Sequence, residues 1–359
     1  MRVVVTGGGT GGHIYPALAI VEALGRIDSG LESAFVGGTQ GMEAQVVPPT
    51  GVKFVGVTTR KLRKVISPGT AGVLVALARG YGEASRFLRE FKPQAVISTG
   101  GYVAAATAIA AAKQKIPTIV LAPDAVPGRT NLLVSRWASK ICIMFDDVRA
   151  VFPADKVVLT GLPIRAGIIS DKSVADARSA FGLAPDRFTL LATGGSQGAQ
   201  KLNQLVRGAT SILPPDVQII HQVGARDENA GSVNREGYIS TPFLDAEKMP
   251  LAYRAADVSV CRCGVGSLAE AAANGLPMLM VPLPTAYADH QTHNARAVEV
   301  GKGGILLPQA ELTAEILASQ IEKLYANADD RAEMSRASKA LGRPDAADRV
   351  ARIALDLAL

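Results

Sequence analysis

The stretch that decides the fold is Val3-Val4-Val5-Thr6-Gly7-Gly8-Gly9-Thr10-Gly11-Gly12-His13. Its β-branched run predicts a buried strand, and the glycines after it predict a tight turn into a helix. Backbone N–H groups in such a turn, together with the helix dipole, can bind phosphate or carboxylate. His13 is the one residue of the stretch that can exchange a proton near neutral pH. The stretch therefore predicts an anion-binding or catalytic loop and leaves the reaction open.

Strand-like and helical runs alternate along the whole chain, which is typical of parallel α/β sheets. Strands are expected at residues 3–6, 34–36, 95–98, 118–121 and 140–144, and again at 189–193, 217–222, 258–261, 278–281 and 304–307. Helices are expected at 17–26, 73–91, 200–212, 267–274 and 289–300. Further glycine turns at 98–101 and 192–198 each close a strand and open a helix, so the two halves of the chain are alike.

Two similar halves predict two Rossmann-like domains facing a central cleft that holds the ligand. The 359 residues also exceed the usual size of one hydrophobic core. We place the domains at residues 1–163 and 164–340, joined near Gly161-Leu-Pro163. An amphipathic helix within 341–359 either packs on its own domain or crosses back to the first.

The amino-acid composition indicates what kind of protein this is and which kinds of partner it is expected to bind. Apolar residues make up 48% and charged residues 19%, as in an ordered globular protein. Residues 1–165 hold 19 Lys and Arg against 10 Asp and Glu, whereas the remainder holds 19 against 22. The two halves are therefore expected to contact different partners. Aromatic residues are only 5% and no binding module is recognisable, so no nucleic-acid partner is expected.

Cysteine usage and hydropathy favour a cytoplasmic protein. Cys142, Cys261 and Cys263 form no disulfide framework and lack the further ligands of a zinc site. No signal peptide is expected, because the chain runs directly into a strand. The uncharged run between Lys92 and Lys113 contains a proline and a glycine turn. It predicts a strand, a loop and an alanine-rich helix rather than a membrane span.

Gly7, Gly9 and Gly12 also fit the G-x-G-x-x-G fingerprint of dinucleotide-binding enzymes. That fingerprint needs an acidic residue at the end of the next strand, where it binds the ribose. The next strand ends in Gly37-Gly38-Thr39, and the strand after the third glycine turn ends in His221-Gln222. Neither end carries a carboxylate, so no nicotinamide or flavin cofactor is expected.

The strongest constellation is Gly264-Val265-Gly266-Ser267-Leu268-Ala269-Glu270. A strand ends here at a turn whose N–H groups can hold a diphosphate, and Glu270 can reach a ribose diol from the first turns of the helix. The alternative is a glutamate that only complements the helix dipole. Downstream, Asp289, His290 and Gln291 can bind sugar hydroxyls, although Asp289 could simply cap a helix.

Three motifs together resemble the MurG family. They are Gly8-Gly9-Thr10-Gly11-Gly12-His13 with Pro16-Ala17-Leu18-Ala19, Gly194-Gly195-Ser196-Gln197-Gly198-Ala199 with Leu202-Asn203, and His290-Gln291-Thr292 with Asn294-Ala295. The resemblance covers nearly the whole chain with its motifs in order. It implies a GT-B fold and an inverting transfer of N-acetylglucosamine (GlcNAc) from UDP-GlcNAc to the C4 hydroxyl of undecaprenyl-diphosphate-linked MurNAc-pentapeptide, which converts lipid I to lipid II.

The resemblance also implies roles for individual residues, with His13 and Glu270 as the residues on which catalysis depends. His13 is the candidate general base, although it could instead only orient the acceptor. The implied substrate-binding residues are Thr10, Gly11, Gly12, Asp124, Arg165, Ser196, Leu244 through its backbone at the uracil, Val265, Gly266, Ser267, Leu268, Ala269, Glu270 and Gln291 at the GlcNAc. Because the chain has no Asp-x-Asp motif, neither a metal nor another cofactor is expected.

One departure from the family keeps other readings open. The family typically has Glu-Gln-Asn where this chain has Ala122-Pro123-Asp124, and an ionised Asp124 cannot donate a hydrogen bond to the donor sugar. The alternatives are a related GT-B transferase for another glycolipid or UDP-sugar, a UDP-sugar epimerase, and a sugar-nucleotide-binding protein without catalysis.

The basic half also carries a candidate membrane face. Arg60-Lys-Leu-Arg63-Lys64-Val-Ile66 mixes cations with apolar residues. In the helix that follows, Val73, Leu77, Tyr81, Ala84, Leu88 and Phe91 recur at helical spacing, with Arg79, Arg86 and Arg89 beside them. The helix could simply face the core. With the basic half it predicts peripheral docking on the anionic, cytoplasmic face of the cell membrane.

Overall fold

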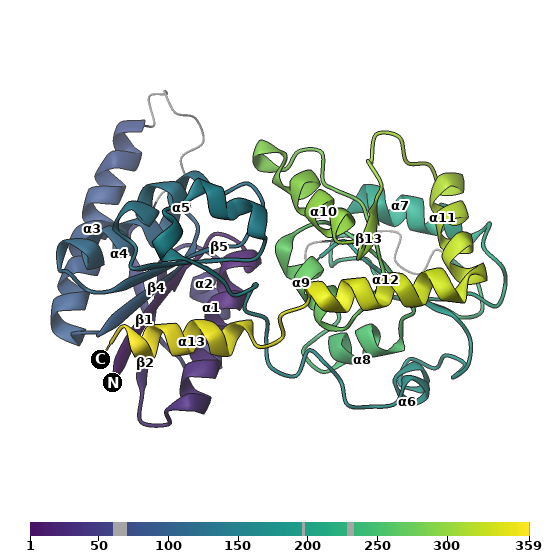
Figure 1. Ribbon diagram of the computed structural model, residues 1–359, viewed down its shortest axis with the longest axis horizontal. Coiled ribbons are helices and arrows are strands. Elements are labelled where there is room, and N and C mark those ends of the chain that lie inside the picture. Colours follow the sequence, from purple (N-terminus) through teal and green to yellow (C-terminus); the bar gives the residue numbers. More distant parts are fainter. Residues whose placement is uncertain (60–69, 196–197, 228–232, 359) are drawn as a thin grey trace. The chain divides into compact units, whose positions relative to one another are not determined.

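The computed structural model describes residues 1–59, 70–195, 198–227 and 233–358, with only the backbone described for 70–74. These residues form two compact units (Figure 1). Unit 1 comprises Met1–Arg165 and Pro344–Leu359, and unit 2 comprises Ala166–Arg343. Each unit is built on one parallel β-sheet. The expected α/β architecture with two parallel sheets is confirmed.

The sheet of unit 1 has the order β3-β2-β1-β4-β5-β6-β7. Its strands are β1 Arg2–Gly7, β2 Glu32–Gly38, β3 Lys53–Val57, β4 Ala95–Gly100, β5 Thr118–Ala122, β6 Lys140–Ile143 and β7 Val157–Leu159. All neighbours are parallel, and Val4 of β1 is level with Ala34 of β2 and Val96 of β4. The strand order reverses between β1 and β4, which is where parallel α/β sheets bind ligands.

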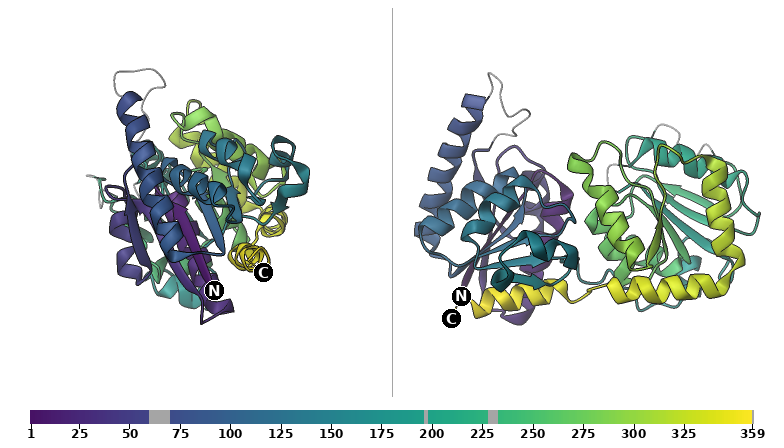
Figure 2. Two further views of the ribbon diagram at one scale, coloured as in Figure 1. Left: turned by 90° about the vertical axis from the view of Figure 1, so that its left-hand side faces the viewer. Right: turned by 45° about the horizontal axis from the view of Figure 1, so that its top comes forward.

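The side chains of β1 alternate between two hydrophobic layers, because successive residues of a strand point to opposite faces. Val3 and Val5 pack with α1 (Gly11–Ile27) and α13 (Ala346–Asp356), whereas Val4 packs under α3 (Thr70–Phe91) and α4 (Tyr102–Lys113). The C-terminal helix α13 thus lies against α1 within unit 1 (Figure 2). The other helices of the unit are α2 Glu43–Val46 and α5 Arg129–Val134, with 3-10 turns at Pro48–Thr50, Ser135–Trp137, Asp146–Val151 and Ala154–Lys156.

The sheet of unit 2 has the order β10-β9-β8-β11-β12-β13, again all parallel. The strands are β8 Thr189–Thr193, β9 Gln218–Gln222, β10 Tyr238–Thr241, β11 Val258–Cys261, β12 Met278–Met280 and β13 Gly304–Leu306. The helices are α6 Val174–Ser179, α7 Gln200–Thr210, α8 Lys248–Ala255, α9 Val265–Ala273, α10 His290–Val300, α11 Ala314–Ala326 and α12 Ala328–Leu341, with a 3-10 turn at Tyr287–Asp289. Here the order reverses between β8 and β11.

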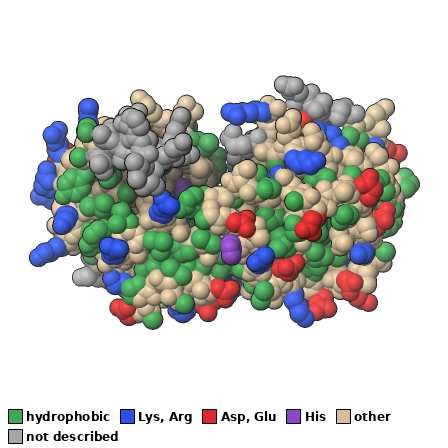
Figure 3. All heavy atoms as spheres, turned by 90° about the horizontal axis from the view of Figure 1, so that it is seen from above, with side chains coloured by type: hydrophobic (Ala, Val, Ile, Leu, Met, Phe, Trp, Pro, Cys, Tyr) green, Lys and Arg blue, Asp and Glu red, His purple; other side chains and the backbone are tan. Residues whose placement is uncertain are grey.

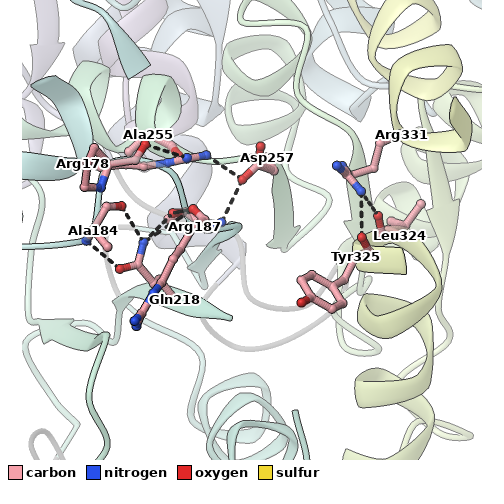
Figure 4. Close-up of polar contacts among 11 residues, drawn as sticks. Arg178, Ala184, Arg187, Gln218, Ala255, Asp257, Leu324, Tyr325 and Arg331 are labelled. Atoms are coloured by element: carbon pink, nitrogen blue, oxygen red, sulfur yellow. Dashed lines mark hydrogen bonds and ion pairs between the residues drawn. The ribbon is translucent and has the colours of Figure 1, made fainter. Parts of the chain in front are cut away.

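Polar contacts brace the amino-terminal edge of this second sheet (Figure 4). Arg178 donates to a carboxylate oxygen of Asp257 (2.7 Å), which also accepts from the N–H of Thr189 (2.8 Å). Gln218 bonds both backbone groups of Ala184, accepting from its N–H (2.7 Å) and donating to its carbonyl (3.0 Å). These contacts lie at the edge opposite the glycine turn after β8.

Each expected strand coincides with an observed one to within a few residues, and three strands were missed. β3, β7 and β10 lie at the edges of their sheets, and most of their residues are not fully buried, so they lack the apolar run that marks a central strand. The first helix begins at Gly11, six residues before the predicted start. The predicted start was too late because Gly11, Gly12 and Pro16 have low helix propensity. No helix of the described part of the chain is long and apolar enough to cross a membrane.

Candidate active site

The predicted residues of unit 1 gather at one edge of its sheet. β1, β4 and β5 are neighbours, and their carboxyl ends lead into the loop with Thr10–His13, the turn at Gly100–Gly101 and the segment with Asp124. Thr10 and Gly12 are exposed, and Gly11, His13 and Asp124 are partly exposed. Parallel strands present all their carboxyl ends at the same edge, so this edge is the candidate site of unit 1.

Internal packing explains the first glycines of this loop. A Cβ added at Gly7 would lie 2.0 Å from Oγ1 of Thr99, and one at Gly8 would lie 2.4 Å from a carboxyl oxygen of Glu43. Gly9 has a φ of +84°, a backbone conformation that side chains with a Cβ disfavour. The glycines at 7 and 8 are therefore required by neighbours within the protein.

Those neighbours include Glu43, a wholly buried carboxyl group at the start of α2. Its two oxygens accept from the N–H of Gly9 (3.0 Å) and the N–H of Gly38 (2.9 Å). Each oxygen of this carboxyl group therefore has a backbone N–H donor. One backbone donor of the first glycine loop is thus already bonded to a carboxyl group of the protein itself.

His13 is held by the carboxyl end of β4. Its Nδ1 lies 2.9 Å from the carbonyl oxygen of Thr99, and the Thr99 hydroxyl donates to the carbonyl of His13 (2.8 Å). A carbonyl oxygen only accepts, so Nδ1 carries the hydrogen in this contact. In the neutral ring the lone pair is then on Nε2, as a general base requires.

The turn at Gly100 brings a second polar side chain close to this ring. A Cβ at Gly100, where φ is +98°, would lie 3.1 Å from Nδ1 of His13 and 3.3 Å from Oδ1 of Asn131. The Asn131 amide donates to the carbonyl of Leu121 (2.9 Å), and among the described residues its buried Oδ1 has no hydrogen-bond partner. Gly100 therefore lets the imidazole and this amide approach the same turn.

In unit 2 the predicted residues follow the carboxyl ends of neighbouring strands in the same way. Gly194 and Gly195 follow β8, Leu244 comes shortly after β10, and α9 begins four residues after β11. Gln291 lies in the first turn of α10, after β12. Ser196 lies outside the described residues. Leu244, the start of α9 and Gln291 therefore belong to the same edge of the second sheet.

The start of α9 offers backbone donors and one carboxylate. Gly264 precedes the helix without a side-chain cap, so N–H groups of Val265, Gly266 and Ser267 lack partners within the helix. The side chains of Val265, Leu268 and Ala269 are buried, which leaves these residues only backbone groups to offer. Glu270 is partly exposed, and Oε2 of its carboxylate accepts from the Tyr253 hydroxyl (3.2 Å).

Two of the predicted contacts are tied to specific partners. The N–H of Leu244, a wholly buried residue, donates to Oε1 of Gln222 (3.0 Å). Oε1 of Gln291 accepts from the N–H of Leu283 (3.0 Å). The amide nitrogen of Gln291 takes no part in this bond and is a hydrogen-bond donor. The Leu244 N–H is therefore engaged, whereas Gln291 keeps a donor group for a ligand.

The cysteines are unsuited to nucleophilic chemistry. All three are buried, and burial raises the pKa of Cys142 and of Cys261 to about 12. A thiol with such a pKa is not a thiolate at neutral pH. Within the described ranges, no three His, Cys, Asp or Glu residues are arranged to hold a metal ion.

Comparisons with known proteins agree with this arrangement. Residues 3–143 match the glycosyltransferase family 28 N-terminal domain and residues 189–350 its C-terminal domain. Over its whole length the chain is 36% identical to 99% of the UDP-N-acetylglucosamine–N-acetylmuramyl-(pentapeptide) pyrophosphoryl-undecaprenol N-acetylglucosamine transferase of Desulforudis audaxviator. It is 35% identical, over 98% of both chains, to the Bacillus subtilis protein of that name. The chain belongs to the MurG family.

The crystal structure of Acinetobacter baumannii MurG supports this assignment at the level of the fold. It superposes with a TM-score of 0.78 over 99% of both chains at 27% identity. The predicted GT-B class, with two Rossmann-like domains, is confirmed for this MurG-family chain. Arg165 is the last residue of the first segment of unit 1.

Sequence reasoning missed three residues of this MurG-family site: Thr99, Glu43 and Gln222. Each makes its contact with or through a backbone group, and such contacts leave no mark in the sequence. Glu43 had one available signal, since it follows Gly37-Gly38 by only five residues and is the carboxylate nearest to the end of the second strand. A ribose-binding acid is expected at the end of the strand itself, and Glu43 lies five residues beyond the end of β2.

Proposed function

We propose that this protein transfers GlcNAc from UDP-GlcNAc to the C4 hydroxyl of undecaprenyl-diphosphate-linked MurNAc-pentapeptide, making lipid II from lipid I. The observation that carries the proposal is the 36% identity over the full chain with a transferase of that name. A glycosyltransferase with an inverting mechanism needs a base for the acceptor hydroxyl and a site that stabilises the departing diphosphate. Unit 1 supplies the candidate base, and unit 2 supplies the candidate diphosphate site.

His13 is the general base in this proposal. Nε2 takes the proton from the C4 hydroxyl while that oxygen attacks the anomeric carbon of GlcNAc. The bond between the anomeric carbon and the diphosphate oxygen breaks, and UDP leaves with the bonding electrons. Thr99 supports the step because its carbonyl holds the hydrogen on Nδ1 and stabilises the imidazolium that forms.

The donor is bound by unit 2 in this proposal. The N–H groups at the start of α9 face the diphosphate, where the helix dipole also favours negative charge. Glu270 accepts from the ribose hydroxyls, and the amide of Gln291 donates to the sugar. Leu244 contacts the uracil through its backbone, and Ser196, of the second glycine loop, lies at the diphosphate and sugar of the donor. In unit 1, Arg165, Asp124, Thr10, Gly11 and Gly12 provide the further substrate contacts that the family resemblance implies.

We further propose that unit 1 docks on an anionic membrane surface on the cytoplasmic side. Near the start of α3, Val75 and Leu77 are 68% and 37% exposed, with the exposed Arg79 beside them. The other end of that helix faces the core, where Ala84, Leu88 and Phe91 are buried. Lys and Arg side chains line the outer edge of unit 1 among hydrophobic ones, whereas Asp and Glu side chains concentrate over unit 2 (Figure 3). The basic run at 60–66 lies outside the described residues.

A transfer assay tests the proposed activity. The purified protein is incubated with labelled UDP-GlcNAc, with and without a short-chain lipid I analogue. Labelled disaccharide lipid and free UDP should appear only with the acceptor. Turnover without acceptor would instead indicate an epimerase or hydrolase. Transfer from another UDP-sugar but not from UDP-GlcNAc would show that Asp124 marks a different donor.

A vesicle experiment tests the proposed membrane surface. Sedimentation of the protein with phosphatidylglycerol vesicles should exceed sedimentation with phosphatidylcholine vesicles and should weaken with salt.

A further inference from the structure

Gln222 is a buried side chain at the carboxyl end of β9, directly beneath two segments of the proposed donor site. It is 1% exposed and belongs to the strand between β8 and β10. The glycine loop after β8 lies on one side of it and the segment with Leu244, after β10, on the other. A primary amide has both donors and acceptors, so it can bond to both neighbours at once.

The hydrogen bonds of Gln222 join these two segments. Its Nε2 donates to the carbonyl of Gly195 (3.1 Å) and lies 3.4 Å from the Thr193 hydroxyl. Its Oε1 accepts from the N–H of Leu244 (3.0 Å). The Thr193 hydroxyl in turn accepts from the N–H of Gly195 (3.1 Å). One side chain therefore bonds both to Gly195 of the glycine loop and to the backbone at Leu244.

The neighbouring residues hold the same loop against β9. A Cβ at Gly198, where φ is +74°, would lie 2.3 Å from the carbonyl oxygen of Val223. The amide of Asn203, on α7, donates to that same carbonyl (2.7 Å). Gly198 is thus packed on the end of β9, and Gln222, the residue before Val223, also bonds to Leu244.

We infer that Gln222 is a positioning residue that sets the distance between the uracil and diphosphate parts of the donor site. The inference rests on the proposed function, in which Leu244 meets the uracil and the glycine loop lies at the diphosphate end of the donor. A ligand that spans both segments needs them at the correct separation, whereas a ligand that touches one of them does not. Gln222 acts through these backbone segments and does not contact the reacting atoms.

An amide suits this place better than a carboxylate would. A glutamate at 222 would still accept from the N–H of Leu244, but its ionised oxygens could not donate to the carbonyl of Gly195. It would also add a negative charge beneath the loop that is expected to lie near a diphosphate. Gln222→Glu therefore tests the donor half of the bridge, and Gln222→Met removes both halves while keeping a similar length.

The experiment compares UDP, which spans both segments, with uridine, which lacks the diphosphate. Affinity for UDP is measured by isothermal titration calorimetry on the full chain, and affinity for uridine by competition against UDP. Each Gln222 variant should weaken UDP about tenfold or more, as expected when a buried hydrogen-bonded partner is removed, while uridine weakens less than about threefold. In the transfer assay, KM for UDP-GlcNAc should rise and KM for the acceptor should stay unchanged.

Gln218 is the matched control (Figure 4). It is a second buried glutamine of β9, and its amide bridges the N–H and the carbonyl of Ala184 at the opposite edge of the sheet. Gln218→Met should lower the melting temperature as much as Gln222→Met does, because each leaves a backbone N–H and a carbonyl unpaired. It should leave the affinity for UDP unchanged.

The outcomes separate the inference from the proposed function. Parent-like affinity for UDP in a folded Gln222 variant would overturn the inference alone, as would an equal loss for UDP and uridine or an equal effect of Gln218→Met. If Gln222→Met does not fold, the isosteric Gln222→Glu decides by the same criteria. A parent chain that binds UDP without transferring GlcNAc would overturn only the proposed activity, and one that binds no UDP would overturn both.

Discussion

The two glycine loops of this protein have the same position in their sheets but are anchored by different chemistry. Each follows the central strand beside the reversal of strand order, β1 in unit 1 and β8 in unit 2. The first is bonded to the buried carboxyl group of Glu43 and leads to His13. The second is bonded to the neutral amide of Gln222.

This difference matches the task proposed for each loop. In the first loop the carboxyl group of Glu43 already accepts from the N–H of Gly9, so this backbone donor is not available to a ligand anion. A neutral amide beneath the second loop leaves the backbone donors and the helix dipole of α9 free of an opposing charge. Two loops with nearly the same glycine pattern are thus suited to different ligands, and the side chains beneath them account for the difference.

The largest effect is expected at His13. His13→Ala should lower kcat by about 10²- to 10⁴-fold, which is the usual contribution of a general base. Affinity for UDP should stay at the parent value, since the donor is assigned to the other loop. Stopped-time transfer assays at saturating substrates give kcat, and calorimetry gives the affinity. If the variant keeps most of its transfer rate, His13 is not the general base, and the catalytic task proposed for the first loop is wrong.

Glu270 should show the opposite pattern. Glu270→Gln removes an ionised acceptor for the ribose hydroxyls and should weaken UDP by about 10- to 100-fold, as for hydrogen bonds to charged groups. Part of the loss belongs to the bond from Tyr253, so Tyr253→Phe is the control and should have a smaller effect. If Glu270→Gln instead lowered kcat with unchanged affinity for UDP, Glu270 would not be a ribose ligand.

The sequence predicted the positions of these loops better than it predicted what holds them. His13 and Glu270 were identifiable because a buried strand, a glycine turn and a helix start place them at the carboxyl edge of a sheet. The central strands were found for the same reason, since their apolar runs are long.

The anchors could not be predicted in that way. Glu43 and Gln222 bond to backbone N–H and carbonyl groups that every residue carries, so no pairing of residue types identifies them. Their contacts also cross between strands and helices whose separation depends on the folded sheet. Thr99 is similar, because it holds the imidazole with a carbonyl oxygen. Buried side chains that support loops through backbone contacts are the part of a site that a single sequence leaves open.

Replacing the carboxyl group of Glu43 by an amide tests directly how important it is for the first loop. In Glu43→Gln one end of the side chain becomes a donor, so either Gly9 or Gly38 loses its acceptor. We expect kcat to fall about tenfold or less, with a lower melting temperature and unchanged affinity for UDP. Glu90→Gln, an exposed change on α3, is the control and should affect none of these. Loss of affinity for UDP in Glu43→Gln would mean that the first loop also binds the donor.

The smallest effect concerns the pH dependence of stability beneath the second loop. Burial and the charge of Arg207 lower the pKa of His221 from 6.5 to about 4. In the fold, Nδ1 of His221 accepts from the Tyr238 hydroxyl (2.8 Å), and Nε2 donates to Oδ1 of Asn203 (3.2 Å). As the pH falls through 6.5 the unfolded chain binds a proton that the folded chain rejects. Stability is therefore fully present above that pH and is lost progressively toward pH 4.

Between about pH 7 and about pH 5.5 this group should destabilise unit 2 by about 1 kcal/mol. Amide hydrogen exchange of β9, followed by mass spectrometry, measures that change locally. His221→Gln can still accept from Tyr238 and donate to Asn203, and it does not titrate, so it should flatten the pH dependence of β9 and leave that of β1 unchanged. An identical pH dependence of β9 in parent and variant would show that the titrating group is not His221. The side chains beneath the second loop, including the neutral Gln222, would then not contribute to the pH dependence of stability.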